Sequence, residues 1–210
     1  MKKVILQPTS SKESRKEYFD TIECSVSLSR IKPFVSTKDF EILKDLHPNG
    51  ECKLWGIKSS TRNINKWNKI KEGDLAMFVR KGKFFATASV THKVHSPSLA
   101  NEVWGSDDNE TWEFIYFVKN VETENLKQSV FNNAVGYKDN FVVQGFSVLN
   151  YEKSFEVLKL LYSKPIKKVD VEIWYGEQME CLVKVDGKIS SWSQIKNVEE
   201  VLNYLPRNNK

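Results

Sequence analysis

The feature that most constrains the fold is a pair of apolar segments joined by a very short turn. The segment LAMFVR (75–80) is followed by Lys81-Gly82-Lys83 and then by FFATASVTHKV (84–94). Runs rich in β-branched and aromatic residues on either side of a glycine-containing turn predict a β-hairpin. We therefore expect a sheet that is largely antiparallel and is built around this hairpin.

Further segments predict additional strands and a few short helices. The expected strands are residues 1–7, 52–58, 112–121, 141–149, 169–175 and 179–185, and the expected helices are 14–23, 37–46, 99–103, 153–162 and 193–204. Thr37 is the expected N-cap of its helix, and residues 27–34 are compatible with either a strand or a helix. This succession predicts a mixed fold with a small, curved sheet.

Length and composition indicate one folded domain of ordinary size, or a main domain with a small appendage. The chain has 210 residues, of which 40% are hydrophobic and 12% aromatic, which is enough to bury a core. No apolar run is long enough to span a bilayer, so we expect no membrane association and a location in a prokaryotic cytoplasm. We divide the chain into an N-terminal segment (1–50), a central domain (51–165) and a C-terminal extension or connector (166–210).

Cysteine and histidine usage argues against a metal site. The three cysteines are widely spaced, and His92 and His95 lie near none of them in the sequence. The chain contains no GxxxxGK[ST], GxGxxG or GxSxG motif. We therefore expect no cofactor, no metal and no catalytic residues.

The modest net charge of +5 hides a division along the chain. Residues 53–93 carry ten lysines and arginines against only Glu72 and Asp74, whereas residues 101–124 carry seven acidic residues against Lys119. A basic segment favours a partner with a negative backbone, nucleic acid first and an anionic membrane surface second. An ordinary solvated face is the alternative for each single lysine.

Four of the six tryptophans lie close together in the sequence, at positions 55, 67, 104 and 112. Trp104 and Trp112 flank the polar run GSDDNET (105–111). Trp104 ends a short helical stretch and opens this loop, where an indole has little core to fill, whereas packing in the core is an equal alternative for Trp55 and for Trp112. An indole held at the mouth of a loop beside a basic strand is what a base-stacking pocket needs.

The order of these segments resembles the PUA-like superfamily, in particular its EVE and YTH branches. The resemblance covers roughly residues 52–150 and rests on WGIK (55–58), Trp67, the turn Gly73-Asp74, FVRKGKFFATASV (78–90) and NEVWGSDDNETWEFIYFV (101–118). Within this superfamily, the chain is most similar to the N-terminal DNA-recognition domains of McrB-type, modification-dependent restriction proteins. The resemblance implies an α+β fold in which a small, curved, mainly antiparallel β-barrel is flanked by short helices, with a small C-terminal α/β extension.

The resemblance also implies a non-catalytic reader of a methylated base, N6-methyladenine or methylcytosine, flipped out of double-stranded DNA into an aromatic cage. Trp104 is the first candidate for a cage wall, Trp55 the second, and Trp112 the third or a support from beneath; Trp67 is a wall or a cap of the barrel. Ser59 and Ser60 are candidates to bind the edge of the base. The candidates for phosphate contacts are Lys58, Arg62, Lys66, Lys69, Arg80, Lys81 and Lys83.

Two other functions stay open on the sequence. One is a reader of methylated single-stranded RNA from the same superfamily. The other is a small nucleotide- or RNA-processing enzyme, although His92 and His95, three residues apart on a strand, point to opposite faces. For the favoured function, the expected partners beside DNA are the NTPase and nuclease subunits or domains of a restriction complex.

Overall fold

The computed structural model describes residues 2–106, 110–162, 169–175, 179–185 and 188–195. The chain divides into two compact units, Met1–Lys159 and Leu160–Lys210. The first unit holds a large sheet with its helices. The described part of the second unit contains a three-stranded antiparallel sheet in the order β10-β9-β8, formed by β8 (Val169–Tyr175), β9 (Met179–Val185) and β10 (Lys188–Ile195).

The sequence predicted two of these C-terminal strands, β8 and β9. It also predicted a helix at 193–204, and this prediction is wrong for residues 193–195. Residues 193–195 belong to β10, which pairs with β9, and residues 196–210 lie outside the described part of the chain.

Seven strands of the first unit form one sheet in the order β2-β3-β6-β5-β4-β1-β7. Among the described residues, neighbouring strands pair antiparallel apart from β1 and β4, which are parallel with Val4 opposite Leu75. The strands are β1 (Val4–Pro8), β2 (Val26–Ser27), β3 (Glu51–Ile57), β4 (Leu75–Arg80), β5 (Lys83–His95), β6 (Phe114–Lys127) and β7 (Ser147–Val148). The predicted α+β class with a mainly antiparallel sheet is confirmed, and residues 1–50 contribute two strands to the sheet itself.

The hairpin predicted at residues 75–94 is formed by β4 and β5. Arg80 pairs with Lys83, so the turn has two central residues, Lys81 and Gly82. Both have positive φ, +48° and +70°, as expected for the two-residue turns that match the twist of antiparallel strands.

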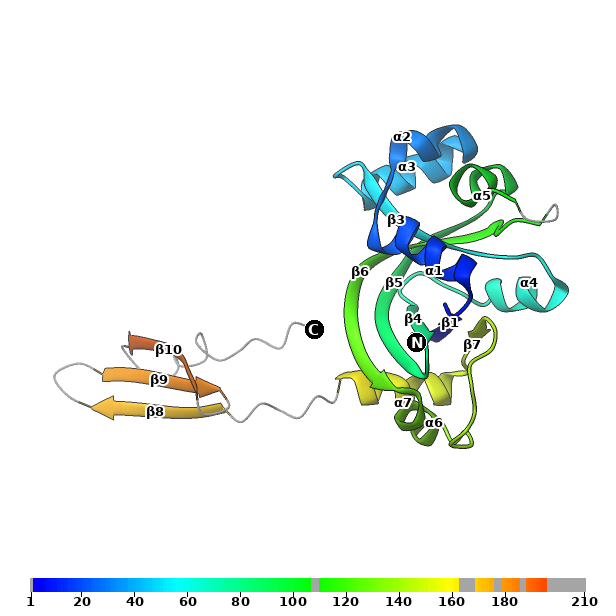
Figure 1. Ribbon diagram of the computed structural model, residues 1–210. Helices are drawn as coiled ribbons and strands as arrows, with labels where there is room; N and C mark the ends of the chain where they lie inside the picture. The colour runs from blue at the N-terminus through cyan, green and yellow to red at the C-terminus, as the bar shows by residue number, and fades with distance from the viewer. Residues whose placement is uncertain (1, 107–109, 163–168, 176–178, 186–187, 196–210) are drawn as a thin grey trace. The chain divides into compact units, whose positions relative to one another are not determined.

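Irregular pairing in β5 and β6 gives the sheet its strong curvature. The register between these strands shifts at three places along β5, between residues 84 and 86, 87 and 89, and 90 and 92. Each bulge bends the strand and increases the local twist. In Figure 1 β5 and β6 accordingly curve side by side around the interior of the unit.

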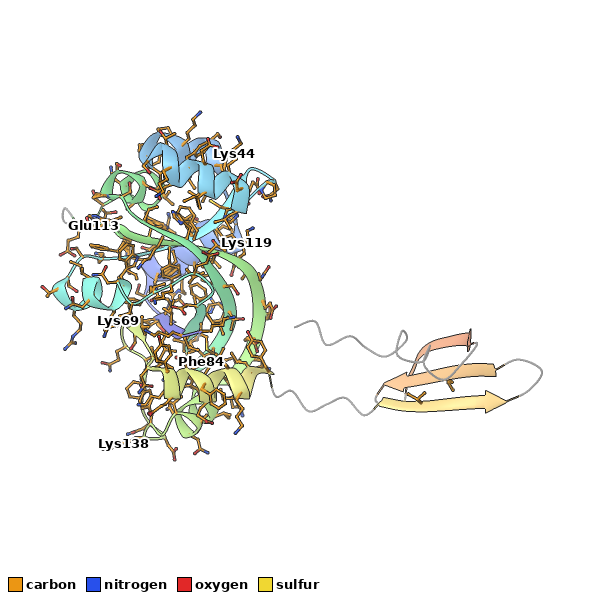
Figure 2. The ribbon with its side chains drawn as sticks, turned by 180° about the vertical axis from the view of Figure 1, so that it is seen from behind. Lys44, Lys69, Phe84, Glu113, Lys119 and Lys138 are labelled. Carbon is orange, nitrogen blue, oxygen red and sulfur yellow. The ribbon has the colours of Figure 1, made fainter. Side chains whose placement is uncertain are left out.

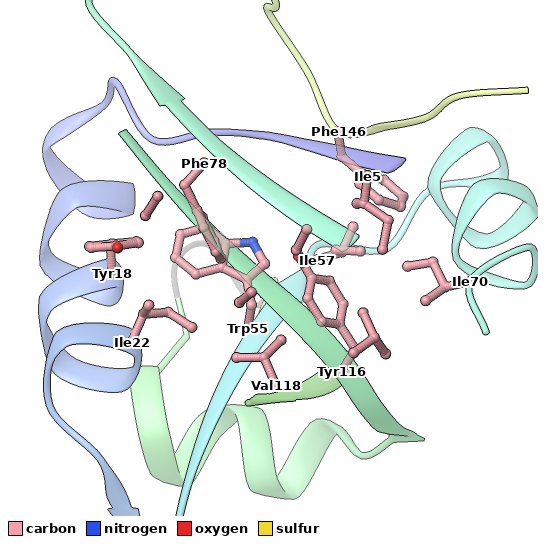
Figure 3. Packing of buried hydrophobic residues seen from close by; sticks show 14 of the residues in the cluster. Ile5, Tyr18, Ile22, Trp55, Ile57, Ile70, Phe78, Tyr116, Val118 and Phe146 are labelled. Carbon is pink, nitrogen blue, oxygen red and sulfur yellow. The ribbon is translucent and has the colours of Figure 1, made fainter. Parts of the chain in front are cut away.

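The two faces of the curved sheet pack against different cores. On β6, Tyr116 belongs to the inner cluster and Phe117 to the outer one, as the alternation of side chains along a strand requires. The inner cluster also contains Trp55, Phe78 and Ile5, whose side chains meet inside the sheet (Figure 3). The outer cluster packs against the helices that cover the outside.

Short helices surround the sheet, and several begin at a serine that accepts a backbone hydrogen bond, namely Ser11, Ser36, Ser60 and Ser96. The α-helices are α1 (Lys12–Tyr18), α2 (Leu28–Ile31), α3 (Thr37–Leu46), α4 (Thr61–Trp67), α5 (Pro97–Trp104), α6 (Gln128–Ala134) and α7 (Tyr151–Tyr162). A π-turn, η1 (Phe19–Glu23), continues α1, and a 3-10 turn, η2 (Lys32–Phe34), continues α2. The cap of α3 is therefore Ser36, one residue before the expected Thr37.

The strand expected at residues 141–149 is reduced to the two residues of β7. Two side chains of α6 bind the backbone just before it: Gln128 Nε2 and Asn132 Nδ2 donate to the Phe141 carbonyl at 2.7 and 2.9 Å. Because side chains satisfy this carbonyl, the segment does not need a neighbouring strand there.

Candidate nucleic-acid interface

The candidate site lies at the end of the sheet where β3 finishes and β6 begins. Ile57 pairs with Phe114, so Lys58 and Trp112, which lie just outside these strands, come together. Lys58 Nζ is 4.9 Å from the centre of the half-buried Trp112 ring and 3.8 Å from Glu110 Oε2. A cation–π contact and an ion pair thus hold a positive charge beside an indole.

Gly56 allows two tryptophans to pack against the backbone of β3. A Cβ atom placed on Gly56 would lie 2.5 Å from both the Cβ atom and the carbonyl oxygen of Trp112, and 2.7 Å from Cζ3 of Trp104. These distances are far below van der Waals contact, so any side chain at this position would displace the loop. The close approach explains why a glycine interrupts this apolar strand.

A pocket of about 220 Å³ opens beside Trp112. Its lining consists of Trp112 and Lys58 together with residues on and just before α1, namely Ser11, Glu13, Ser14 and Glu17. Its volume lies below the roughly 300 to 1,000 Å³ of sites for drug-sized ligands. The pocket therefore has room for one small group at a time.

Trp104 lies beside this pocket without lining it. Its half-buried ring packs against the outer cluster and against Gly56. Its Nε1 atom is buried and has no hydrogen-bond partner among the described residues. Of the two tryptophans that flank the polar loop, Trp112 thus faces the pocket, whereas the sequence ranked Trp104 first.

Trp55 is part of the inner core. Its exposed fraction is 3%, and its ring lies 5.3 Å from Phe78 and 6.4 Å from Tyr18, measured between ring centres. Figure 3 shows the ring among these side chains, inside the curved sheet. The structure therefore separates Trp55 from the pocket.

Trp67 caps the end of the inner core, one of the two roles expected for it. The ring packs edge-on against Phe114 at 5.3 Å, and Nε1 donates to the carbonyl oxygen of Ile115 at 3.4 Å. Lys93 Nζ lies 4.2 Å from the centre of the same ring.

Ser59 and Ser60 follow Lys58 and are both exposed. Ser60 caps α4, because its Oγ atom accepts a hydrogen bond from the Asn63 amide at 3.1 Å. Asn63 Nδ2 donates in turn to the Lys58 carbonyl at 3.0 Å. This arrangement fixes the loop next to the pocket and leaves the Ser59 side chain toward solvent.

The basic residues of α4 and its C-terminal end differ in their availability. Arg62 and Lys69 are exposed, and Figure 2 shows Lys69 on the opposite side of the unit from Lys119. Lys66 is half-buried and donates to the Phe146 carbonyl. Burial, with a smaller contribution from the charge of Arg62, lowers the pKa of Lys66.

The basic hairpin lies away from this pocket. Lys83 pairs with Lys127 at one end of β6, whereas Trp112 precedes the other end. Lys81 and Lys83 are exposed, and the Arg80 guanidinium stacks 4.2 Å above the Phe85 ring. The structure therefore does not bring the seven predicted phosphate contacts together in one patch.

A larger cleft of about 1110 Å³ lies near this hairpin. Its lining includes the basic residues Lys53, Arg80 and Lys83 together with acidic residues of β6 and η1. Mixed charge gives this cleft no net attraction for a polyanion.

The sequence did not point to Glu17 as a site residue. Burial raises the pKa of Glu17 to about 7, an effect that the charge of Lys58 only partly offsets. The helix expected at 14–23 includes this residue, but Glu17 lines the pocket with Lys58 and Trp112, which are distant in sequence, so no local pattern reveals its place.

Neither a metal cluster nor a paired catalytic set emerges from the described residues. No group of three potential metal ligands is present among them. His92 Nε2 lies 2.8 Å from Asp39 Oδ1, and His95 Nε2 lies 3.2 Å from Glu113 Oε1, so each histidine has its own carboxylate. Within the same residues, no helix is long and apolar enough to cross a membrane.

The first unit is thus a curved, mainly antiparallel sheet with short flanking helices. Among solved structures, the chain is similar to the N-terminal domain of Thermococcus gammatolerans McrB, in a structure bound to m5C DNA. The TM-score is 0.54 at 17% sequence identity, and the match covers 77% of this chain and 98% of that domain. No protein-family model and no curated protein matches the sequence. The predicted resemblance to McrB-type N-terminal domains is thereby confirmed at the level of the fold.

Proposed function

We propose that this chain is a non-catalytic DNA-binding module that recognises a methylated base, extruded from the duplex into the pocket between α1 and Trp112. The observation that carries the proposal is the half-buried indole of Trp112, which lines a pocket of about 220 Å³ with Lys58 beside it. An aromatic wall stacks on a base, and a nearby cation attracts the DNA backbone.

The cost of extruding a base and the gain from stacking it on an indole are of similar size. Extruding a base costs a few kcal/mol, and stacking on one indole returns about 1 to 3 kcal/mol. Burial of a methyl group adds about 0.8 kcal/mol. Phosphate contacts must supply the remainder, so affinity should depend on salt, and preference for the methylated base should be modest.

In this proposal Arg62 and Lys69 make the phosphate contacts nearest the pocket, because both are exposed on the adjacent segment. We further propose that Ser59, which is exposed, binds the base or its phosphate. In the same proposal, Lys81 and Lys83 contact the DNA only when the duplex is long enough to extend to the other end of β6.

The shared fold supports DNA as the ligand, since the McrB domain to which this chain is similar was captured with m5C DNA. We propose methylcytosine or N6-methyladenine as the base. The module would then supply specificity to an NTPase and a nuclease carried by other domains or subunits.

Fluorescence anisotropy with labelled oligonucleotides tests the proposal. The duplexes carry one 5-methylcytosine, one N6-methyladenine or no modification, and a methylated single-stranded RNA is measured in parallel. We expect a methylated duplex to bind best and Trp112→Ala to weaken that binding about tenfold. The matched control is Phe155→Ala, which removes an exposed aromatic ring from α7, outside the pocket.

Two results would count against the proposal. Equal binding of all duplexes, unchanged by Trp112→Ala, would show that the pocket does not bind a base. Tighter binding of the methylated RNA than of any duplex would favour the RNA reader.

A further inference from the structure

Glu17 is a largely buried acid that lines the pocket. Its residue is 7% exposed, yet its carboxyl group forms no hydrogen bond or ion pair with any part of the chain that the structure describes. Its backbone carbonyl accepts from Thr21 Oγ1 at 2.8 Å. The carboxyl oxygens are not among the fully buried polar atoms that lack a partner, so they keep some exposure to the open space of the pocket.

Glu17 and Trp112 line the same small pocket. One group held there can therefore stack on the indole and meet the acid at its edge. The pocket thus offers one flat face and one hydrogen-bonding group.

Charged groups on each neighbouring element face Glu17. Lys58, after β3, lowers its pKa, as does Lys16 on α1, whereas Glu13 on α1 and Asp20 on η1 raise it. Burial outweighs all of them, and the pKa of Glu17 reaches about 7. Near neutral pH the free protein therefore contains both the neutral and the ionised form.

We propose that the neutral carboxyl group of Glu17 binds the Watson–Crick edge of the extruded base through two hydrogen bonds. This inference rests on the proposed function. The Glu17 O–H donates to the ring nitrogen, N3 of cytosine or N1 of adenine, and its carbonyl oxygen accepts from the neighbouring exocyclic N–H. An ionised carboxylate would set an oxygen against the lone pair of that ring nitrogen. The ligand is thus an uncharged base with an adjacent donor and acceptor.

Proton linkage makes the binding depend on pH. If only the neutral form binds, the apparent dissociation constant rises as the neutral fraction falls. With half-ionisation near pH 7, affinity weakens about tenfold between pH 6 and pH 8. Glutamine keeps one donor and one acceptor and does not ionise, so Glu17→Gln abolishes this dependence. Glu17→Leu removes both hydrogen bonds and weakens binding at every pH.

The experiment measures binding of the full chain to a duplex with one 5-methylcytosine at pH 6, 7 and 8. A duplex in which N4,N4-dimethylcytosine replaces it removes the exocyclic donor, and a third with N6-methyladenine distinguishes the two kinds of base. We expect the tenfold loss for the unaltered chain, none for Glu17→Gln, and weak binding of the dimethylated duplex.

Each outcome separates this inference from the proposed function. Equal pH profiles for the unaltered chain and Glu17→Gln, or full affinity in Glu17→Leu, would overturn the role of Glu17 even where Trp112→Ala still weakens binding. Loss of the Trp112 effect would instead overturn the base pocket itself.

Discussion

Replacing Glu17 by glutamine also tests what the buried acid costs the fold. Burial raises the pKa of Glu17 from 4.5 to about 7, whereas in the unfolded chain the group ionises near its ordinary value. Between these two values the native state binds more protons than the unfolded state. The free energy of unfolding therefore falls as the pH rises through this window, and the loss is complete above pH 7.

The magnitude follows from the size of the shift. A change from 4.5 to about 7 corresponds to about 3 kcal/mol. The pocket admits water, which screens the carboxylate, so we expect about 1 to 2 kcal/mol in practice. Because glutamine carries no charge, Glu17→Gln should be more stable than the unaltered chain by this amount at pH 8 and equally stable at pH 4.

Urea denaturation followed by circular dichroism at pH 4, 6 and 8 measures the difference. The control is Glu13→Gln on the same helix, where a backbone hydrogen bond lowers the pKa of the native carboxyl group; this change should give no gain at pH 8. An equal difference in the free energy of unfolding between Glu17→Gln and the unaltered chain at pH 4 and at pH 8 would contradict this prediction.

Two further predictions concern the surroundings of the pocket. Gly56→Ala introduces a Cβ atom 2.5 Å from Trp112. Overpacking of this kind should lower the free energy of unfolding, measured by urea denaturation, by about 1 to 3 kcal/mol, and it should also weaken DNA binding. Unchanged stability would mean that the loop around Trp112 can move away at no cost. Arg62→Gln should reduce the slope of log affinity against log salt by about one, whereas Lys138→Gln, near α6, should leave it unchanged, and equal slopes for both variants would exclude Arg62 as a phosphate contact.

The sequence predicted the local parts of the fold well. The β4–β5 hairpin follows from two apolar runs and a Lys81-Gly82 turn, and β3 from its apolar residues. These features depend on neighbours in the chain. The parallel pairing of β1 with β4 could not be predicted, because it joins residues that are 71 positions apart, such as Val4 and Leu75.

The sequence singled out the loop between Trp104 and Trp112, and the structure decides which of the two tryptophans lines the pocket beside it. Trp104 and Trp112 both flank a polar loop, and only the packing on Gly56 decides which one faces the pocket. Trp55 has the same residue type and a nearby position, but the alternation along β3 turns it into the core. Glu17 has no local signature, because its neighbours in the pocket, Lys58 and Trp112, are distant in sequence.

The place of β1 in the sheet has a consequence for the order of folding. β1 lies between β4 and β7, with Ile5 opposite both Ala76 and Val148. Both partners are distant in sequence, so closing these loops costs chain entropy before the contacts repay it. During synthesis β1 emerges long before β7, and its apolar residues remain unpaired meanwhile. The sheet should therefore assemble slowly, with the edge of β1 exposed to intermolecular pairing until the last strand arrives.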